Sequence, residues 1–152
     1  MAAEETAPDD GTKYGKYLIK EPYMHFYQTD SFTVAPDKLG VDCIITSQGF
    51  VEPIDNVGKE PHKHDFHQIL CFIGGDPTNV KEFGAEVHMF LGEELEEHVI
   101  TTNTAVTVPP GLYHCPINFV KVDKPVVFLE IMLVNAYKSS TLADANKDGS
   151  KE

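Results

Sequence analysis

Residues 61–72 include His62 and His64, two histidines separated by a single residue, in a stretch with the composition of a β-strand. Side chains alternate sides in an extended strand, so His62, His64 and Gln68 are expected on one face. Neutral imidazole is the commonest protein ligand for a transition metal, and two imidazoles on one strand face can hold one ion. The stretch therefore predicts a strand that presents ligands to a metal, although the spacing alone also fits a polar edge strand that happens to carry histidines.

A third histidine follows a rigid turn near residue 110. Pro109 fixes its own φ angle, and Gly111 is free to adopt a positive φ, so this segment is expected to turn sharply. His114 comes directly after the turn. A histidine held by such a turn is a candidate partner for the first pair.

Taken together, the two stretches resemble the paired motifs of the cupin family, G-x5-H-x-H-x3,4-E-x6-G and G-x5-P-x-G-x2-H-x3-N. The first motif is matched by His62, His64 and Gly75, with Gln68 where the family usually has glutamate. The second motif is matched by Pro109, Gly111, His114 and Asn118. Asn56 and Asn103 replace the leading glycines, and asparagine tolerates the same turn conformations.

The resemblance implies an all-β fold, a double-stranded β-helix of the jelly-roll or cupin-barrel type, with an extended N-terminal segment and a polar C-terminal tail. We expect a flexible tail over residues 1–13, one cupin domain over 14–137 and a second flexible tail over 138–152. The resemblance also implies that His62, His64 and His114 surround one metal ion. Gln68 would be a fourth ligand or would hold a metal-bound water.

Composition limits the partners. The chain has 152 residues and 41% hydrophobic residues, which suits one globular domain. Its formal net charge of -12 argues against nucleic acid and against an anionic membrane surface, because both attract a basic face. No apolar run is long enough to span a bilayer, and no signal peptide is visible. Three cysteines without zinc-type spacing suggest reduced thiols and a cytoplasmic protein.

Two terminal segments add further expectations. Residues 14–27 are rich in tyrosine and phenylalanine and are too apolar to be loose. They are expected to cover the barrel mouth or to add a strand to a neighbouring subunit, so we predict a homodimer. Residues 144–149 match the first half of an EF-hand loop, but the chain ends before the twelfth position, so calcium binding is not expected there.

Residues 86–91 read as a strand whose inward face is ambiguous. If the apolar face fills the core, Glu86 and His88 are solvated. If the mixed face lines a cavity, Glu86 is a further metal ligand. The sequence leaves both alternatives open.

Residues 126–134 form the most apolar predicted strand, with one charge at its centre. A carboxylate there is costly unless it is paired, hydrogen-bonded or turned towards a polar cavity. Glu130 is therefore either a structural group or a catalytic acid or base, and we favour a cavity-facing position. His25, Tyr27 and Tyr113 complete the pool of candidate acids and bases.

Cys71 and Cys115 border the motif histidines, but each has the opposite strand parity from its neighbouring histidine. They are expected to be small buried apolar residues and not catalytic thiols.

The sequence thus predicts a metal-dependent enzyme. Its substrate is expected to be a small anionic molecule that carries a carbonyl, carboxylate or enolate group. Isomerase, lyase, decarboxylase and dioxygenase reactions all fit. The ligand set suits divalent Fe, Mn, Ni, Co or Zn without choosing among them. The alternative is a non-catalytic module that binds a small molecule or a metal with the same residues.

Overall fold

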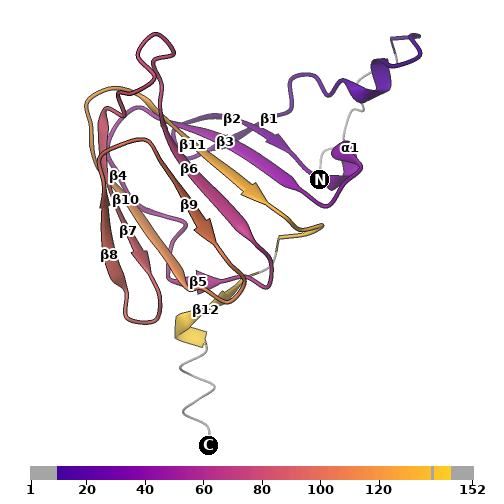
Figure 1. The fold of residues 1–152 in the computed structure, drawn as a ribbon. Helices are drawn as coiled ribbons and strands as arrows, with labels where there is room; N and C mark the ends of the chain where they lie inside the picture. The colour runs from indigo at the N-terminus through magenta and orange to yellow at the C-terminus, as the bar shows by residue number, and fades with distance from the viewer. Residues whose placement is uncertain (1–9, 138, 145–152) are drawn as a thin grey trace, which may run out of the picture.

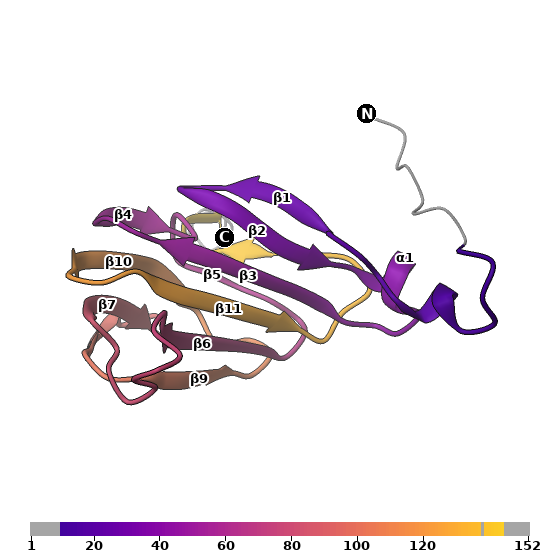
Figure 2. The same ribbon diagram turned by 90° about the horizontal axis from the view of Figure 1, so that it is seen from above.

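Two antiparallel β-sheets face each other and form the molecule (Figures 1 and 2). This computed structural model describes residues 10–137 and 139–144. The first sheet has the order β1-β2-β3-β11-β6-β9, with strands β1 (Tyr23–Phe26), β2 (Thr29–Val34), β3 (Ile44–Phe50), β11 (Val126–Met132), β6 (Gln68–Gly74) and β9 (Thr104–Val108). The second has the order β12-β5-β10-β7-β8, with β12 (Ser140–Thr141), β5 (His62–Lys63), β10 (His114–Val122), β7 (Ala85–Leu91) and β8 (Glu96–Ile100), and β4 (Ile54–Val57) also pairs with β10.

Helical structure among the residues described is limited to η1 (Gly15–Tyr17), α1 (Pro36–Leu39) and one turn at residues 142–144. The architecture confirms the predicted all-β, double-stranded β-helix.

The alternation predicted for residues 62–72 is present, but the segment is not one strand. Every even-numbered residue from His62 to Phe72 is buried, and none of the odd-numbered residues is. The strand is interrupted at residues 64–67, where the chain passes from β5 in the second sheet to β6 in the first. One sequence motif therefore supplies residues to both walls of the barrel.

The core between the sheets is aromatic at its centre. Phe50 stacks on Phe119 with ring centroids 4.2 Å apart, and Phe72 stacks on Phe128 at 5.0 Å. All four rings are at most 1% exposed. Burying a phenylalanine contributes roughly 1.5–3 kcal/mol, so this cluster is a large part of what holds the two sheets together.

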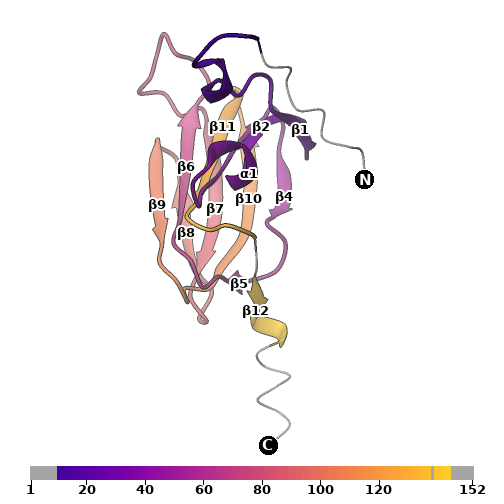
Figure 3. The ribbon, with the colours of Figure 1, turned by 90° about the vertical axis from the view of Figure 1, so that its right-hand side faces the viewer.

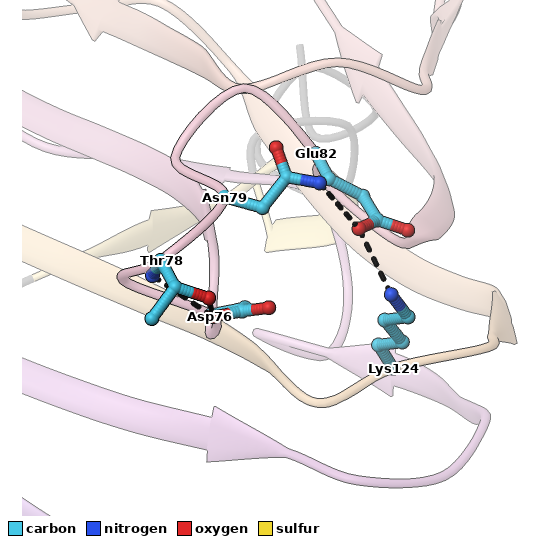
Figure 4. A network of polar contacts seen from close by, with 5 residues as sticks. All are labelled: Asp76, Thr78, Asn79, Glu82 and Lys124. Carbon is cyan, nitrogen blue, oxygen red and sulfur yellow. Dashed lines mark hydrogen bonds and ion pairs between the residues drawn. The ribbon is translucent and has the colours of Figure 1, made fainter.

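The loop between β6 and β7 is tied to the turn between β10 and β11 (Figure 4). The Glu82 carboxylate accepts hydrogen bonds from Asn79 Nδ2 at 3.1 Å and from Lys124 Nζ at 2.9 Å. Thr78 donates to the Asp76 carboxylate through its backbone N–H at 2.9 Å. None of these five residues lines the cavity described below, so the network fixes a corner of the barrel and not the site.

The N-terminal aromatic segment does not cover the barrel, apart from its last two residues, Phe26 and Tyr27, which line the cavity described below. η1 projects away from both sheets (Figure 2), while β1 pairs with β2 at the edge of the first sheet (Figure 3). Large side chains on it are well exposed: Tyr14, Tyr17, Leu18, Tyr23 and Met24. Apart from Phe26 and Tyr27, the segment therefore does not close the barrel mouth, which was the first of the two predicted arrangements.

The C-terminal segment contributes a strand beyond the predicted domain boundary. Ser140 and Thr141 pair with Lys63 and His62 of β5, and Leu142 donates its backbone N–H to the Pro61 carbonyl at 2.9 Å. Residues 140–142 thus pair with β5 and with the segment before it, beyond residue 137. Most of the EF-hand-like segment, like the first nine residues, lies outside the described residues.

Candidate metal centre and cavity

Three histidines from separate parts of the chain meet at one point. His62 on β5 is directly paired with His114, the first residue of β10, and His64 lies in the crossing that follows β5. One ring nitrogen from each lies within 4.8 Å of the others. All three side chains are buried, at 7%, 5% and 2% exposure for His62, His64 and His114. The two sequence motifs are therefore brought together as the resemblance implied.

The orientation of two of these rings is fixed by the backbone. His62 Nδ1 lies 2.9 Å from the Glu60 carbonyl, and His114 Nδ1 lies 3.0 Å from the Leu112 carbonyl. A carbonyl oxygen can only accept, so each Nδ1 carries the hydrogen and each Nε2 keeps its lone pair. Histidine ligands of metals are commonly oriented in this way.

Protonation also suits metal binding. Burial, together with the neighbouring His62 and His64, lowers the pKa of His114 to about 4, although its bond to Leu112 opposes the shift. His114 is consequently neutral at physiological pH, and neutral imidazole is the form that binds metals.

Gln68 is the candidate for a fourth ligand beside the three histidines. Its side chain is 4% exposed and lines the same cavity as His62 and His114. Its Oε1 is buried and has no hydrogen-bond partner among the described residues. A buried carbonyl oxygen without a donor is costly, and a metal ion or a metal-bound water would satisfy it. The residues present therefore fit a divalent transition metal.

A cavity of about 370 Å³ lies beside the histidines, between the sheets. The first sheet contributes side chains from β1, β2, β3, β6 and β11, and the second contributes residues from β4, β5 and β10. This size and this mixture of apolar and polar lining are typical of a small-molecule site.

Glu130 lines this cavity at the centre of β11. It is directly paired across the sheet with Thr46 of β3 on one side and Leu70 of β6 on the other. Burial raises the pKa of Glu130 to about 7. The carboxyl group therefore exists in both protonation states near neutral pH, which a general acid or base requires.

The other predicted acids and bases do not share one location. Tyr27 lines the cavity, and its hydroxyl oxygen accepts a hydrogen bond from the Gly58 N–H at 3.0 Å. His25 is exposed on the edge strand β1, where its Nδ1 lies 3.2 Å from Asp30. Tyr113 is buried but does not line the cavity, and Lys63 Nζ lies 5.1 Å from the centre of its ring.

Glu86 is not part of the histidine cluster. Val87 and Met89 of β7 are buried, so the apolar face fills the core, the first of the two alternatives. Glu86 points the other way, is 40% exposed and lies 3.6 Å from His88 Nε2. The prediction that Glu86 is a further metal ligand is therefore wrong, because its side chain lies on the opposite face of β7 from the core and outside the histidine cluster.

Cys115 was missed as a cavity residue. Strand parity predicts that it points away from His114, but both are buried because the register shifts between residues 114 and 117 and Cys115 has a φ of 81°. Its thiol lines the cavity, and burial and then Glu130 raise its pKa to about 12. It is a neutral thiol at neutral pH. Cys71, also expected to be buried, is only partly buried.

Tyr137, at the predicted end of the domain, is a cavity residue that the sequence does not predict. Its ring lies 5.1 Å from that of His64, edge to face, and 6.4 Å from that of Phe66, and it lines the cavity. A tyrosine just before a polar tail gives no sequence signal of this position, because the returning segment is placed by the pairing of β12 with β5.

Comparison with known proteins gives no match at the level of sequence, neither to a family model nor to a curated protein. Solved structures do match. An oxalate decarboxylase has a TM-score of 0.52 at 15% identity, over 80% of this chain and 30% of its own. Bacillus subtilis oxalate decarboxylase, studied for its Mn(II) centres, gives 0.51 at 16% identity over 79% and 29%.

The polyketide cyclase RemF from Streptomyces resistomycificus gives a TM-score of 0.51 at 12% identity, over 74% of this chain and 70% of its own. At such identities the likeness shows the fold alone. The chain covers less than a third of each of the decarboxylase chains above.

Proposed function

The chain has the cupin fold, and from its three-histidine cluster we propose that it is a metal-dependent enzyme acting on a small molecule with a carbonyl, carboxylate or enolate group. The observation that carries the proposal is the position of the cluster, at the wall of a cavity that also contains a titratable carboxyl group. Isomerase, lyase, decarboxylase and dioxygenase reactions are compatible with it.

His62, His64 and His114 would hold the metal, and Gln68 would be a fourth ligand or would hold a bound water. A divalent ion held there supplies a Lewis acid that polarises a substrate oxygen and stabilises negative charge developing on it. Fe, Mn, Ni, Co and Zn all suit three imidazoles and an oxygen donor. A Mn(II) protein among the structural neighbours supports including manganese.

The donor set carries no negative charge. Three neutral imidazoles and an amide leave a divalent charge uncompensated, whereas the glutamate usual at position 68 in the family would cancel part of it. The cavity is therefore expected to favour an anionic oxygen, a carboxylate or an enolate, as its substrate group. Oxalate, the substrate named for two of the neighbours, has this chemistry.

Glu130 is the proposed acid or base. It lines the same cavity as His62 and His114, and with a pKa near 7 it can take up or give up a proton at low cost. Tyr27 is the second candidate, because its hydroxyl already accepts a hydrogen bond and can donate its own hydrogen into the cavity. His25 and Tyr113 are not retained for this role, because neither lines the cavity.

The alternative function is a binding module that holds a metabolite or metal without turnover. The same four donors would serve it, but a purely binding cavity has no need of a buried carboxyl group with a raised pKa. Glu130 is the observation that favours the enzyme.

Turnover distinguishes the two functions. The metal-loaded protein would be incubated with a panel of small keto, hydroxy and dicarboxylic acids, and products would be followed by NMR. Glu130→Gln should lower turnover by about 10² to 10⁴ while leaving metal content unchanged. Ser47→Ala, on the outward face of β3, is the matched control. Ligand binding without product in any mixture would support the binding module instead.

The assembly and location remain proposals. We infer a homodimer from the exposed aromatic segment around β1, and a cytoplasmic protein from its free cysteines. No helix in the described part of the chain is long and apolar enough to cross a membrane.

A further inference from the structure

The first sheet lines the cavity with polar side chains for which the proposed chemistry has no use. Thr46 and Gln48 of β3 are 5% and 6% exposed, and Thr33 of β2 is half-buried. All three line the cavity that also contains His62 and His114, which lie on the other sheet. They are too deep to be explained as solvated surface groups.

Two of these side chains have buried oxygens without a donor. Gln48 Oε1 and Thr33 Oγ1 have no hydrogen-bond partner among the described residues. Gln48 is paired in register with Phe128, a fully buried member of the aromatic core. An apolar residue would be the stable choice at this position, because a buried acceptor that has lost water and gained no donor is destabilising.

The strand register arranges these groups in an ordered way. Thr33 is directly paired with Thr46, and Thr46 is directly paired with Glu130, so the three form one row across β2, β3 and β11. Residues opposed in this way lie about 5 Å apart. Gln48 lies two residues further along β3, on the same face, whereas Gln68 lies in the row on the opposite side of Glu130. The polar wall thus runs from the metal end of the cavity to the aromatic core.

We propose that this wall recognises hydroxyl groups, so that the substrate is a hydroxylated carboxylic acid whose carboxylate lies at the histidines and whose hydroxyl groups lie at Gln48, Thr33 and Thr46. This inference rests on the proposed function for the carboxylate end alone. The proposed recognition of the hydroxyl groups is supported independently, by the unsatisfied acceptors of the first sheet.

The chemistry of the acceptors favours a hydroxyl over an ammonium group. An amide oxygen and two threonine hydroxyls are neutral and can accept from a neutral O–H. A buried ammonium would require a fixed anion, and Glu130, the acidic residue that lines the cavity, is half-protonated near neutral pH. A divalent charge at the histidines would repel it as well.

Matched pairs of acids test the proposal in the protein as purified with its metal. Isothermal titration calorimetry would compare butyrate with 4-hydroxybutyrate, valerate with 5-hydroxyvalerate and hexanoate with 6-hydroxyhexanoate, with 4-aminobutyrate as the ammonium probe. Because the hydroxyl lies far from the carboxylate in each pair, it does not act by chelating the metal. At one chain length or more, the hydroxy acid should bind about tenfold more tightly than its partner, since a site with unsatisfied acceptors discriminates against an analogue lacking the donor.

Gln48→Met, which keeps the shape but removes the amide, should reduce that preference to about twofold or less. Ser47→Ala, on the opposite face of the same strand, should leave it unchanged. If Gln48→Met does not fold, Thr33→Val serves the same purpose on β2.

Three results would overturn the inference: equal binding of the hydroxy and unsubstituted acids at every length, no binding of any of them, or tightest binding by 4-aminobutyrate. These failures are distinguishable from failure of the proposed function. A protein that holds metal and binds unsubstituted acids as well as hydroxy acids keeps its metal site and loses only the hydroxyl specificity. A protein without metal loses the proposed function whatever the acids do.

Discussion

His62 and His114 are directly opposed across the antiparallel pair β5–β10, with their ring centroids 4.4 Å apart. Each donates its Nδ1 hydrogen to a backbone carbonyl two residues earlier in the chain. The strand pairing therefore sets the distance between the rings, and the local backbone sets which nitrogen is free. A metal ion would find two ligands already oriented before it binds, which reduces the entropy lost on binding.

The charge of the site can be tested at Gln68. Gln68→Glu should tighten divalent metal binding by at least about tenfold and weaken binding of a carboxylate ligand, because two unit charges 4 Å apart interact by about 4 kcal/mol at an effective dielectric constant of 20. Metal affinity would be measured by competition with a chelator, and carboxylate affinity by calorimetry.

The matched control is Gln48→Glu, which makes the same change on the cavity wall away from the histidines and should tighten metal binding far less. If Gln68→Glu leaves both affinities as they are in the wild type, the Gln68 amide is not directed at the metal.

Glu130 should make stability depend on pH. Its folded pKa of about 7 lies above the ordinary value of 4.5, so the folded state holds the proton more tightly than the unfolded state. The stability linked to this proton is fully present below about pH 4.5 and is lost as pH rises through 7. Glu130→Gln removes this loss and should gain about 2–3 kcal/mol relative to the wild type between pH 5 and pH 8, measured by urea unfolding of metal-free protein.

His114 has the opposite effect on the pH dependence of folding stability. Because its pKa is lowered in the folded state, stability falls as pH falls from 6.5 towards 4. Both proteins in the Glu130 comparison share that effect, so it cancels in their difference. A difference in stability that stays constant from pH 5 to pH 8 would mean that the Glu130 carboxyl group is not buried as the structure has it.

The exposed N-terminal segment predicts a dimer. The outer edge of β1 pairs with no other strand among the residues described, and Tyr23 and Met24 on it are 61% and 53% exposed. An uncovered apolar edge is a template for association. The double variant Tyr23→Lys, Met24→Lys should be a monomer where the wild type is a dimer, with the molar mass measured by light scattering after size exclusion. Its circular dichroism spectrum should be unchanged.

Val120→Lys is the control for that experiment, because Val120 is 40% exposed on β10, in the other sheet. It should leave the dimer intact. A wild-type protein that is monomeric at every concentration would contradict the predicted homodimer.

The strand alternation and the turn before His114 were readable from local sequence, whereas the barrel fold and the clustering of the three histidines were predicted from the resemblance of the two motifs to the cupin family. Side-chain direction within a strand follows from a period of two as long as the strand is regular. The burial of Cys115 was predicted, but its place in the cavity lining was not, because a register shift beside His114 breaks that period and such shifts depend on the partner strands.

Positions that depend on distant pairing could not be assigned. Whether Glu86 faced the cavity depended on which face of β7 met the core, and Tyr137 was positioned by a short strand far along the chain. Thr46 and Gln48 lie on the face of β3 that also carries Phe50, so the local pattern did not distinguish a cavity wall from core. The register that joins β3 to β11 places both residues in the cavity wall that contains Glu130.

The metal content of the protein tests the central claim most directly. Protein purified without added metal would be analysed by inductively coupled plasma mass spectrometry, beside the double variant His62→Ala, His114→Ala and the control His25→Ala, whose ring is exposed on β1. We predict close to one transition metal ion per chain in the wild type and the control, and none in the double variant. Full occupancy in the double variant, or no metal in the wild type even after incubation with Fe, Mn, Ni, Co and Zn salts, would contradict the assignment of these histidines as a metal centre.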